Sequence, residues 1–176
     1  MTEEVRRERS PGIKLLLVGI VGFILMVPLL LGSVDLIDVM GANKRAQNAA
    51  ASLADVVARD TEISNAELTS LWRGLDVLMY PNDPGTMEIR ISSISIVNAS
   101  TARVVWSEGH GGMAARTANS TVSLDSRMMN VGSSVIMVES VYKYDAPLGF
   151  LFQNQVRMTH DAYRRSRLVD PIPRVA

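Results

Sequence analysis

The chain has 176 residues, and its 18 basic and 18 acidic side chains give a formal net charge of zero at pH 7. This balance provides no bulk attraction for nucleic acid or another polyanion, so we expect no nucleic-acid partner. The absence of cysteine excludes disulfide bonds, zinc thiolate sites and cysteine nucleophiles.

The first predicted element is an uncharged stretch from Leu15 to Val34, LLLVGIVGFILMVPLLLGSV. About twenty helical residues at roughly 1.5 Å each span about 30 Å, the thickness of a bilayer's hydrocarbon core. We therefore predict a transmembrane helix over residues 15–34. One alternative is a buried core helix, although such helices are seldom apolar on every face. The other is a signal peptide, whose apolar run is usually shorter and ends at a small-residue cleavage site.

The flanks of this stretch predict its orientation. Basic side chains precede it at Arg6, Arg7, Arg9 and Lys14. Because basic residues stay on the cytoplasmic side, we predict a cytoplasmic tail over residues 1–14 and an extracytoplasmic domain over residues 35–176. Asp35 and Asp38 then mark the far membrane interface, since carboxylates are costly at the bilayer centre. The roughly 140 residues that follow suffice for one domain with its own core.

Three residues inside the stretch are candidates for helix packing. Gly19 and Gly22 allow another helix to approach closely. Pro28 cannot donate to the carbonyl of Ile24 and crowds it, which predicts a kink or a local loosening.

After Val34 the apolar positions narrow to one stripe, which predicts that the helix continues into the domain. The stripe comprises Leu36, Ile37, Met40, Ala46, Ala49, Ala50, Leu53, Val56 and Val57. A second helix is predicted between Ser64 and Pro81, with Ser64 as N-cap and Glu67 completing a capping box. Its apolar face comprises Leu68, Leu71, Trp72, Leu75, Leu78 and Met79.

Beyond a turn at residues 82–85 the apolar period changes to two, which predicts strands. They are expected over residues 87–96, 101–107, 133–146 and 152–165. The apolar parity switches at Ser92-Ser93, which predicts a β-bulge there. Residues 108–132 are rich in Gly, Ser, Asn and Thr, which predicts a long irregular loop with room for a short helix or edge strand. The pattern as a whole indicates an α+β, pilin-like fold in which the alanine-rich helix covers an antiparallel sheet of three to five strands.

The sequence contains little that indicates catalysis. His110 and His160 lack metal-ligand spacing, the Gly-His-Gly-Gly stretch lacks the Lys-Ser/Thr of a phosphate loop, and no Gly-x-Ser-x-Gly elbow occurs. We predict no enzymatic activity, cofactor, metal or small-molecule substrate; an anchored hydrolase is the alternative from the enzyme class.

A small basic cluster comprises Arg164, Arg165 and Arg167. It is interpreted as a solvated edge, with docking on lipid headgroups or an acidic partner as the alternative. His110, Arg164, Arg165 and the loop over residues 109–130 are the candidate partner contacts.

Several segments follow one another in a particular order between Phe23 and Leu148. They are FILMVPLLLGSVDLIDV, KRAQNAAASLADVVARD, TEISNAEL, Tyr80-Pro81, ISSISIV, VVWS and VESVYKYDAPL. In this order and spacing they resemble the TadE/TadG group of pseudopilin-related proteins, which belongs to the tight-adherence (Tad, or Flp) pilus system. The resemblance implies a pseudopilin-like component of pilus assembly, anchored in the bacterial inner membrane with a periplasmic domain. Its expected partners are the membrane, other Tad pilus proteins, and pilins or pseudopilins, and incorporation into surface pili stays open.

The alternative is a membrane-tethered extracytoplasmic scaffold or sensor unrelated to pili. The sequence also departs from the family in one respect. Members processed by a prepilin peptidase have Gly followed five residues on by Glu, and alignment on Pro28 places Leu17 and Gly22 at those positions. We therefore expect no cleavage there, and an intact mass lacking the N-terminal tail would contradict this.

Overall fold

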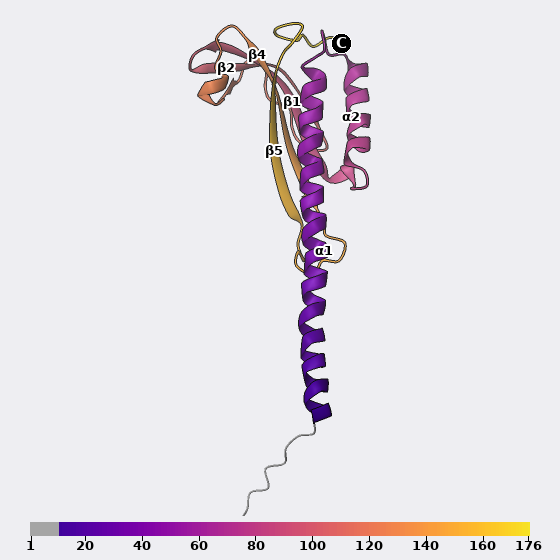
Figure 1. Cartoon of the computed structure of the whole chain (residues 1–176). Coiled ribbons are helices and arrows are strands. Elements are labelled where there is room, and N and C mark those ends of the chain that lie inside the picture. The colour runs from indigo at the N-terminus through magenta and orange to yellow at the C-terminus, as the bar shows by residue number, and fades with distance from the viewer. Residues whose placement is uncertain (1–10) are drawn as a thin grey trace, which may run out of the picture.

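The computed structural model describes residues 11–176 and combines two helices with a five-stranded antiparallel sheet (Figure 1). Helix α1 runs from Pro11 to Val57 over 47 residues, and α2 runs over Asn65–Met79. This confirms the α+β prediction and the sheet of up to five strands. Residues 1–10 of the predicted tail, which include Arg6, Arg7 and Arg9, lie outside the described residues.

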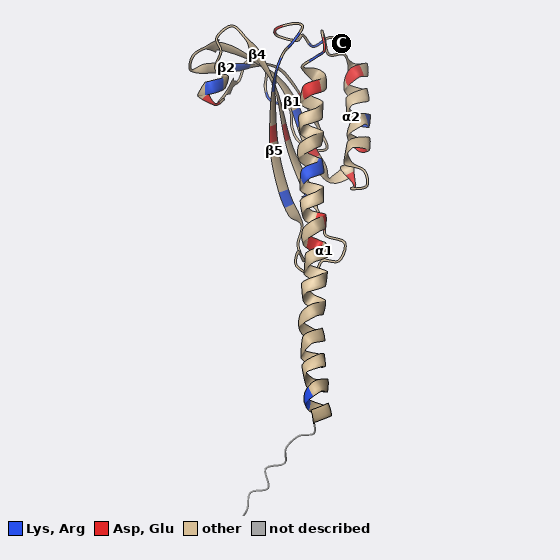
Figure 2. Ribbon diagram, viewed as in Figure 1, with Lys and Arg blue, Asp and Glu red and all other residues tan. Residues whose placement is uncertain are grey.

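The N-terminal half of α1 projects beyond the rest of the molecule (Figure 1). It carries no charged side chain between Lys14 and Asp35, and this part of the helix is uniformly tan in Figure 2. Its large apolar side chains are exposed, as at Leu15, Leu25 and Leu29. Among the described residues, α1 is the one helix long and apolar enough to cross a membrane.

The C-terminal half of α1 lies against the sheet through small side chains. Ala42, Ala46, Ala49 and Ala50 are fully buried, because alanine lets the helix backbone approach the strands closely. The predicted stripe is therefore correct from Ala46 onward, except for Val56, which is exposed.

The prediction is wrong for the first part of the stripe, from Leu36 to Met40. Leu36, Ile37 and Met40 are 47%, 67% and 62% exposed and face away from the sheet. The buried face instead passes through Asp35 and Val39, which continue the helical spacing back from the alanines.

Helix α2 begins with the predicted capping box. The backbone N–H of Glu67 donates to Oγ of Ser64 at 3.2 Å, and Oε2 of Glu67 accepts from the N–H of Ser64 at 2.6 Å. Most of the predicted apolar face is buried or half-buried, but Leu78 is exposed and lies beside α1.

The sheet has the strand order β3-β2-β1-β4-β5. The strands are β1 (Met87–Asn98), β2 (Thr101–His110), β3 (Thr121–Val122), β4 (Ser134–Tyr144) and β5 (Val156–Arg165). The four predicted strands are thus confirmed, with β5 starting later than expected. The predicted loop contains the short edge strand β3 and a 3₁₀ turn over Ser126–Met128.

The predicted bulge at Ser92-Ser93 is wrong, because β1 pairs with β4 there without interruption. The pairing of β1 with β2 shifts register twice: Val105 of β2 is the extra residue opposite Ser93 and Ile94, and Val97 of β1 is the extra residue near the turn. The parity of β1 switches for another reason: Ile91 faces the helices, whereas Ile94 faces a second core on the other side of the sheet. The second core comprises Ile94, Ile96, Ala102, Val104, Val122, Val135 and Met137, with Leu124 and Met129 packed over it.

The C-terminal tail closes the end of the helix-side core. Nε1 of Trp106 donates to the carbonyl of Ile172 at 2.8 Å, and Ile172 is fully buried. The backbone of Ile63 pairs with Pro173 and Val175 at 2.9 Å each. The tail therefore joins β2 to the connection between α1 and α2.

Candidate functional site

The first candidate surface is the exposed half of α1. A Cβ added to Gly19 or Gly22 would meet no atom within 4 Å, so both positions are open to a neighbouring helix. Gly19 also borders a shallow apolar hollow with Leu15, Leu16 and Phe23. The helix continues through Pro28, and Figure 1 shows no sharp bend along its described length, so the predicted kink is not seen there; the local loosening stays a prediction. In transmembrane helices, neighbouring helices or local adjustments of the helix satisfy the backbone group that a proline leaves without a partner.

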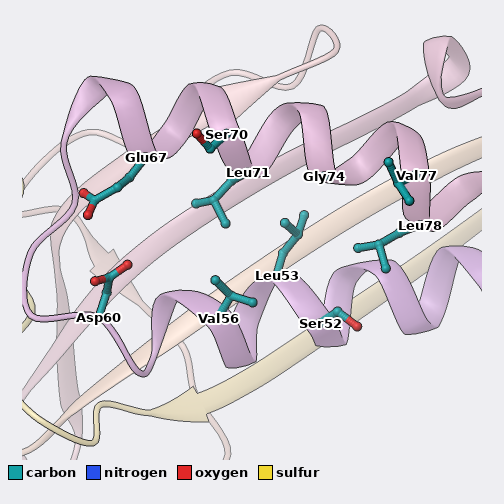
Figure 3. A pocket seen from close by; sticks show the side chains of 10 residues that line it. All are labelled: Ser52, Leu53, Val56, Asp60, Glu67, Ser70, Leu71, Gly74, Val77 and Leu78. Carbon is teal, nitrogen blue, oxygen red and sulfur yellow. The ribbon is translucent and has the colours of Figure 1, made fainter.

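The second candidate surface is an apolar groove of about 560 Å³ between α1 and α2 (Figure 3). We call it the interhelical groove; it is lined by Ser52, Leu53, Val56, Asp60, Glu67, Ser70, Leu71, Gly74, Val77 and Leu78. Figure 3 shows Leu53 and Val56 of α1 facing Leu71 of α2, with Asp60 and Glu67 at one end. Gly74 contributes no side chain to the α2 side of the groove. A Cβ added there would meet no atom within 4 Å, so the space beside it is open.

Sequence reasoning did not find this groove. The available signals were a glycine within an otherwise helix-favouring segment and Val77, an apolar residue outside the predicted apolar face of the second helix. Val77 is 77% exposed. Without knowledge of how α1 and α2 lie together, these signals do not indicate a shared groove.

The third candidate surface lies where α1 meets the domain. Asp35 is 0% exposed, and its Oδ2 accepts a hydrogen bond from the backbone N–H of Leu151 at 2.8 Å. Its Oδ1 has no hydrogen-bond partner among the described residues. The predicted interface carboxylate therefore lies beneath the connection between β4 and β5.

The candidate contact His110 is the last residue of β2. Its ring stacks on Trp72 of α2, with centroids 4.7 Å apart and planes 8° apart. His160 lies on β5, where its Nε2 is 3.0 Å from Oδ1 of Asn43. The two histidines thus have separate structural contacts, and residues 11–176 contain no group of three or more His, Asp or Glu side chains suited to a metal ion.

The basic cluster has an acidic partner within the chain. Asp55 on α1 pairs with Arg167 at 2.6 Å, with Arg164 at 3.8 Å and also with Arg59. These contacts hold β5 and the C-terminal tail against α1. Arg165 is exposed on the same strand and is the member of the cluster that has no ion pair with Asp55 among the described residues.

The loop expected to contact partners is held to the sheet by ion pairs. Glu139 on β4 accepts from Nη2 and Nε of Arg116 at 2.7 and 3.0 Å and from Nε of Arg90 at 2.8 Å. Burial opposes ionisation of Glu139, but the hydrogen bonds from Arg116 and Arg90 outweigh it and hold the pKa of the carboxyl below its usual value. The section of this loop around Arg116 is therefore a fixed part of the domain.

Comparison of the chain with protein-family models, curated proteins and solved structures finds no match. The resemblance to TadE-like proteins therefore stays a prediction. Function is inferred from the three surfaces described above.

Proposed function

We propose that this protein is a non-enzymatic, pseudopilin-like component of pilus assembly. In this proposal residues 15–34 cross the bacterial inner membrane once, the N-terminus is cytoplasmic, and residues 35–176 form a periplasmic domain that engages other pilus proteins. The observation that carries the proposal is the single 47-residue helix α1, apolar and exposed in one half and packed under a sheet in the other.

A continuous helix couples the two halves mechanically. Because α1 has no break between Pro11 and Val57, a lateral contact in the bilayer sets the position of the sheet. Gly19 and Gly22 offer an open surface for such contacts, where small residues let helices pack closely. The interhelical groove supplies a second contact outside the membrane, suited to an apolar segment of another subunit.

The test uses cells that carry a tagged full-length copy in place of the native gene. Sheared surface fibres and inner membranes are separated, and the protein is quantified in each fraction. Recovery in fibres identifies a minor pilin, and membrane retention combined with loss of fibres on gene deletion identifies an assembly factor. Membrane retention with normal fibres after deletion contradicts the pilus proposal.

A matched pair of variants sharpens this experiment. Gly22→Leu adds bulk to the open surface without meeting a neighbouring atom of the chain, so the domain should fold normally. We expect it to reduce fibre formation. Val21→Leu replaces one exposed apolar side chain with another and should leave fibres unchanged.

The second candidate function is a membrane-tethered scaffold that does not take part in pilus formation. The interhelical groove favours it, because a binding surface outside the membrane serves a scaffold equally well. Normal fibres in the deletion strain, together with a protein that crosslinks to other periplasmic proteins through a probe at Val77, would support the scaffold.

A further inference from the structure

The connection between β4 and β5, residues 145–155, extends from the sheet along α1 toward its exposed half. In Figure 1 it lies beside the middle of α1, below the strands. Residues 146–155, APLGFLFQNQ, carry no charged side chain. At its tip Leu148, Phe150 and Leu151 are 52%, 42% and 53% exposed. An exposed apolar tip of this kind is unusual on a surface that faces only water.

Two contacts fix the position of this tip along α1. A Cβ added to Gly32 would lie 3.2 Å from Cδ1 of Leu151, so the glycine makes room for the leucine. The N–H of Leu151 donates to Oδ2 of Asp35 at 2.8 Å. Leu151 is therefore held at the level of Gly32, inside the last turn of the uncharged stretch.

The level of Gly32 determines what surrounds the tip. Gly32 precedes Val34 by two residues, which is about 3 Å along a helix axis. Leu30 and Leu31 of α1 are exposed at the same level. If α1 crosses a bilayer over residues 15–34, the lipid that contacts these leucines also reaches Leu151 and, through it, the exposed Leu148 and Phe150 beside it in the chain.

The buried carboxylate fits this location. Irregular backbone is costly near the hydrocarbon region because its N–H and C=O groups lack water partners. Asp35 accepts one such N–H, that of Leu151, and is itself 0% exposed. Asp35 is thus a positioning residue: by accepting the N–H of Leu151, it holds the connection against α1, close to the acyl chains.

From these observations we infer that the β4–β5 connection is a second membrane contact of the domain. Leu148, Phe150 and Leu151 enter the headgroup–acyl boundary of the outer leaflet beside α1, to the shallow depth typical of interfacial anchors. Two contacts with the bilayer, from α1 and from this tip, fix both the height and the rotation of the domain. The inference rests on the proposed membrane span of α1.

The test uses the full-length protein in vesicles of phosphatidylethanolamine and phosphatidylglycerol. Because the chain has no cysteine, single probes can be placed by Phe150→Cys, Leu25→Cys and Val131→Cys and labelled with a fluorophore. Val131 is exposed and precedes β4 at the end opposite the connection, and Leu25 lies within the proposed span. Quenching by lipids brominated at shallow acyl positions is compared with quenching by aqueous iodide.

We expect brominated lipid to quench the Phe150 and Leu25 probes, which iodide reaches poorly, and iodide to quench the Val131 probe. A Phe150 probe that behaves like the Val131 probe, with the Leu25 probe still lipid-quenched, overturns the inference and leaves the membrane span intact. A Phe150 probe shielded from both quenchers also overturns it, because protein would then cover the tip. A Leu25 probe accessible to iodide contradicts the membrane span itself.

The role of Asp35 has its own test. Asp35→Ala removes the acceptor of the Leu151 N–H and should decrease lipid quenching of the Phe150 probe while increasing iodide quenching. Asp35→Asn retains an acceptor oxygen and should resemble the unsubstituted chain. Equal quenching in the alanine variant and the unsubstituted chain would overturn the positioning role.

Discussion

The two halves of α1 differ in charge and in the size of their apolar side chains. The half over residues 11–34 carries large Leu, Ile, Val and Phe side chains that project from the molecule, whereas the half over residues 35–57 is built around buried alanines. In a helix that faces lipid, large apolar side chains on every side favour membrane insertion. In a helix that packs on a sheet, small side chains allow the helix and the strands to approach closely. The size of the apolar side chains thus distinguishes the projecting half from the half that packs on the sheet, in addition to the difference in charge.

The largest expected effect comes from a matched leucine pair in the same helix. Leu53→Ala should lower the free energy of unfolding of the detergent-solubilised chain by about 2–3 kcal/mol, because it opens a cavity beside the core. Leu25→Ala should leave domain unfolding unchanged, since Leu25 contacts no part of the domain core. Urea unfolding monitored by tryptophan fluorescence measures both, and equal losses in the two variants would contradict the division of α1.

The converse substitution tests side-chain size directly. Ala46→Leu should cost about 1–3 kcal/mol of unfolding free energy, because the fully buried alanine has no space for three more carbons. Gly22→Leu enlarges an open position of the other half and should leave the urea midpoint unchanged. A stable Ala46→Leu variant would show that the interface between α1 and the sheet is loosely packed.

A smaller, pH-dependent effect is expected in the domain. Glu139→Gln should cost about 1 kcal/mol at pH 7, since the partly solvated carboxylate loses charge-assisted hydrogen bonds to Arg90 and Arg116. The folded-state pKa of Glu139 lies below its unfolded value of about 4.3, so this stabilisation is complete above that value and is lost as the pH falls through the lower folded pKa. Unfolding of both proteins from pH 7 to 3 should show the difference shrinking below about pH 4. A difference that does not depend on pH would exclude the carboxylate charge as its source.

The smallest effect is expected at the start of α2. Ser64→Ala removes the side-chain acceptor of the capping box and should cost about 0.5–1 kcal/mol. Ser70→Ala removes a hydroxyl that bonds only to the carbonyl of Ala66 within the same helix and should change stability by less than about 0.5 kcal/mol. Thermal unfolding of the two variants, side by side, tests whether the cap contributes more than an exposed hydroxyl.

Local patterns in the sequence were sufficient to predict most secondary structure. The capping box at Ser64 and Glu67, the four main strands and the continuation of the first helix beyond the apolar stretch all follow from the spacing of neighbouring residues. The apolar face of the helix around Leu36 to Met40 was predicted incorrectly. An apolar residue beside a proposed membrane span has two apolar environments available, and periodicity does not distinguish between them.

The sequence by itself determined the long apolar helix, the second helix and the alternating strands, because each depends on contacts within a few residues. Only the tertiary structure decided the two-sided core of β1, the pairing of Asp55 with Arg164 and Arg167, and the interhelical groove. It also brought Leu151 to Asp35, which are 116 residues apart in the chain. These features depend on which segments lie side by side, and no local pattern carries that information.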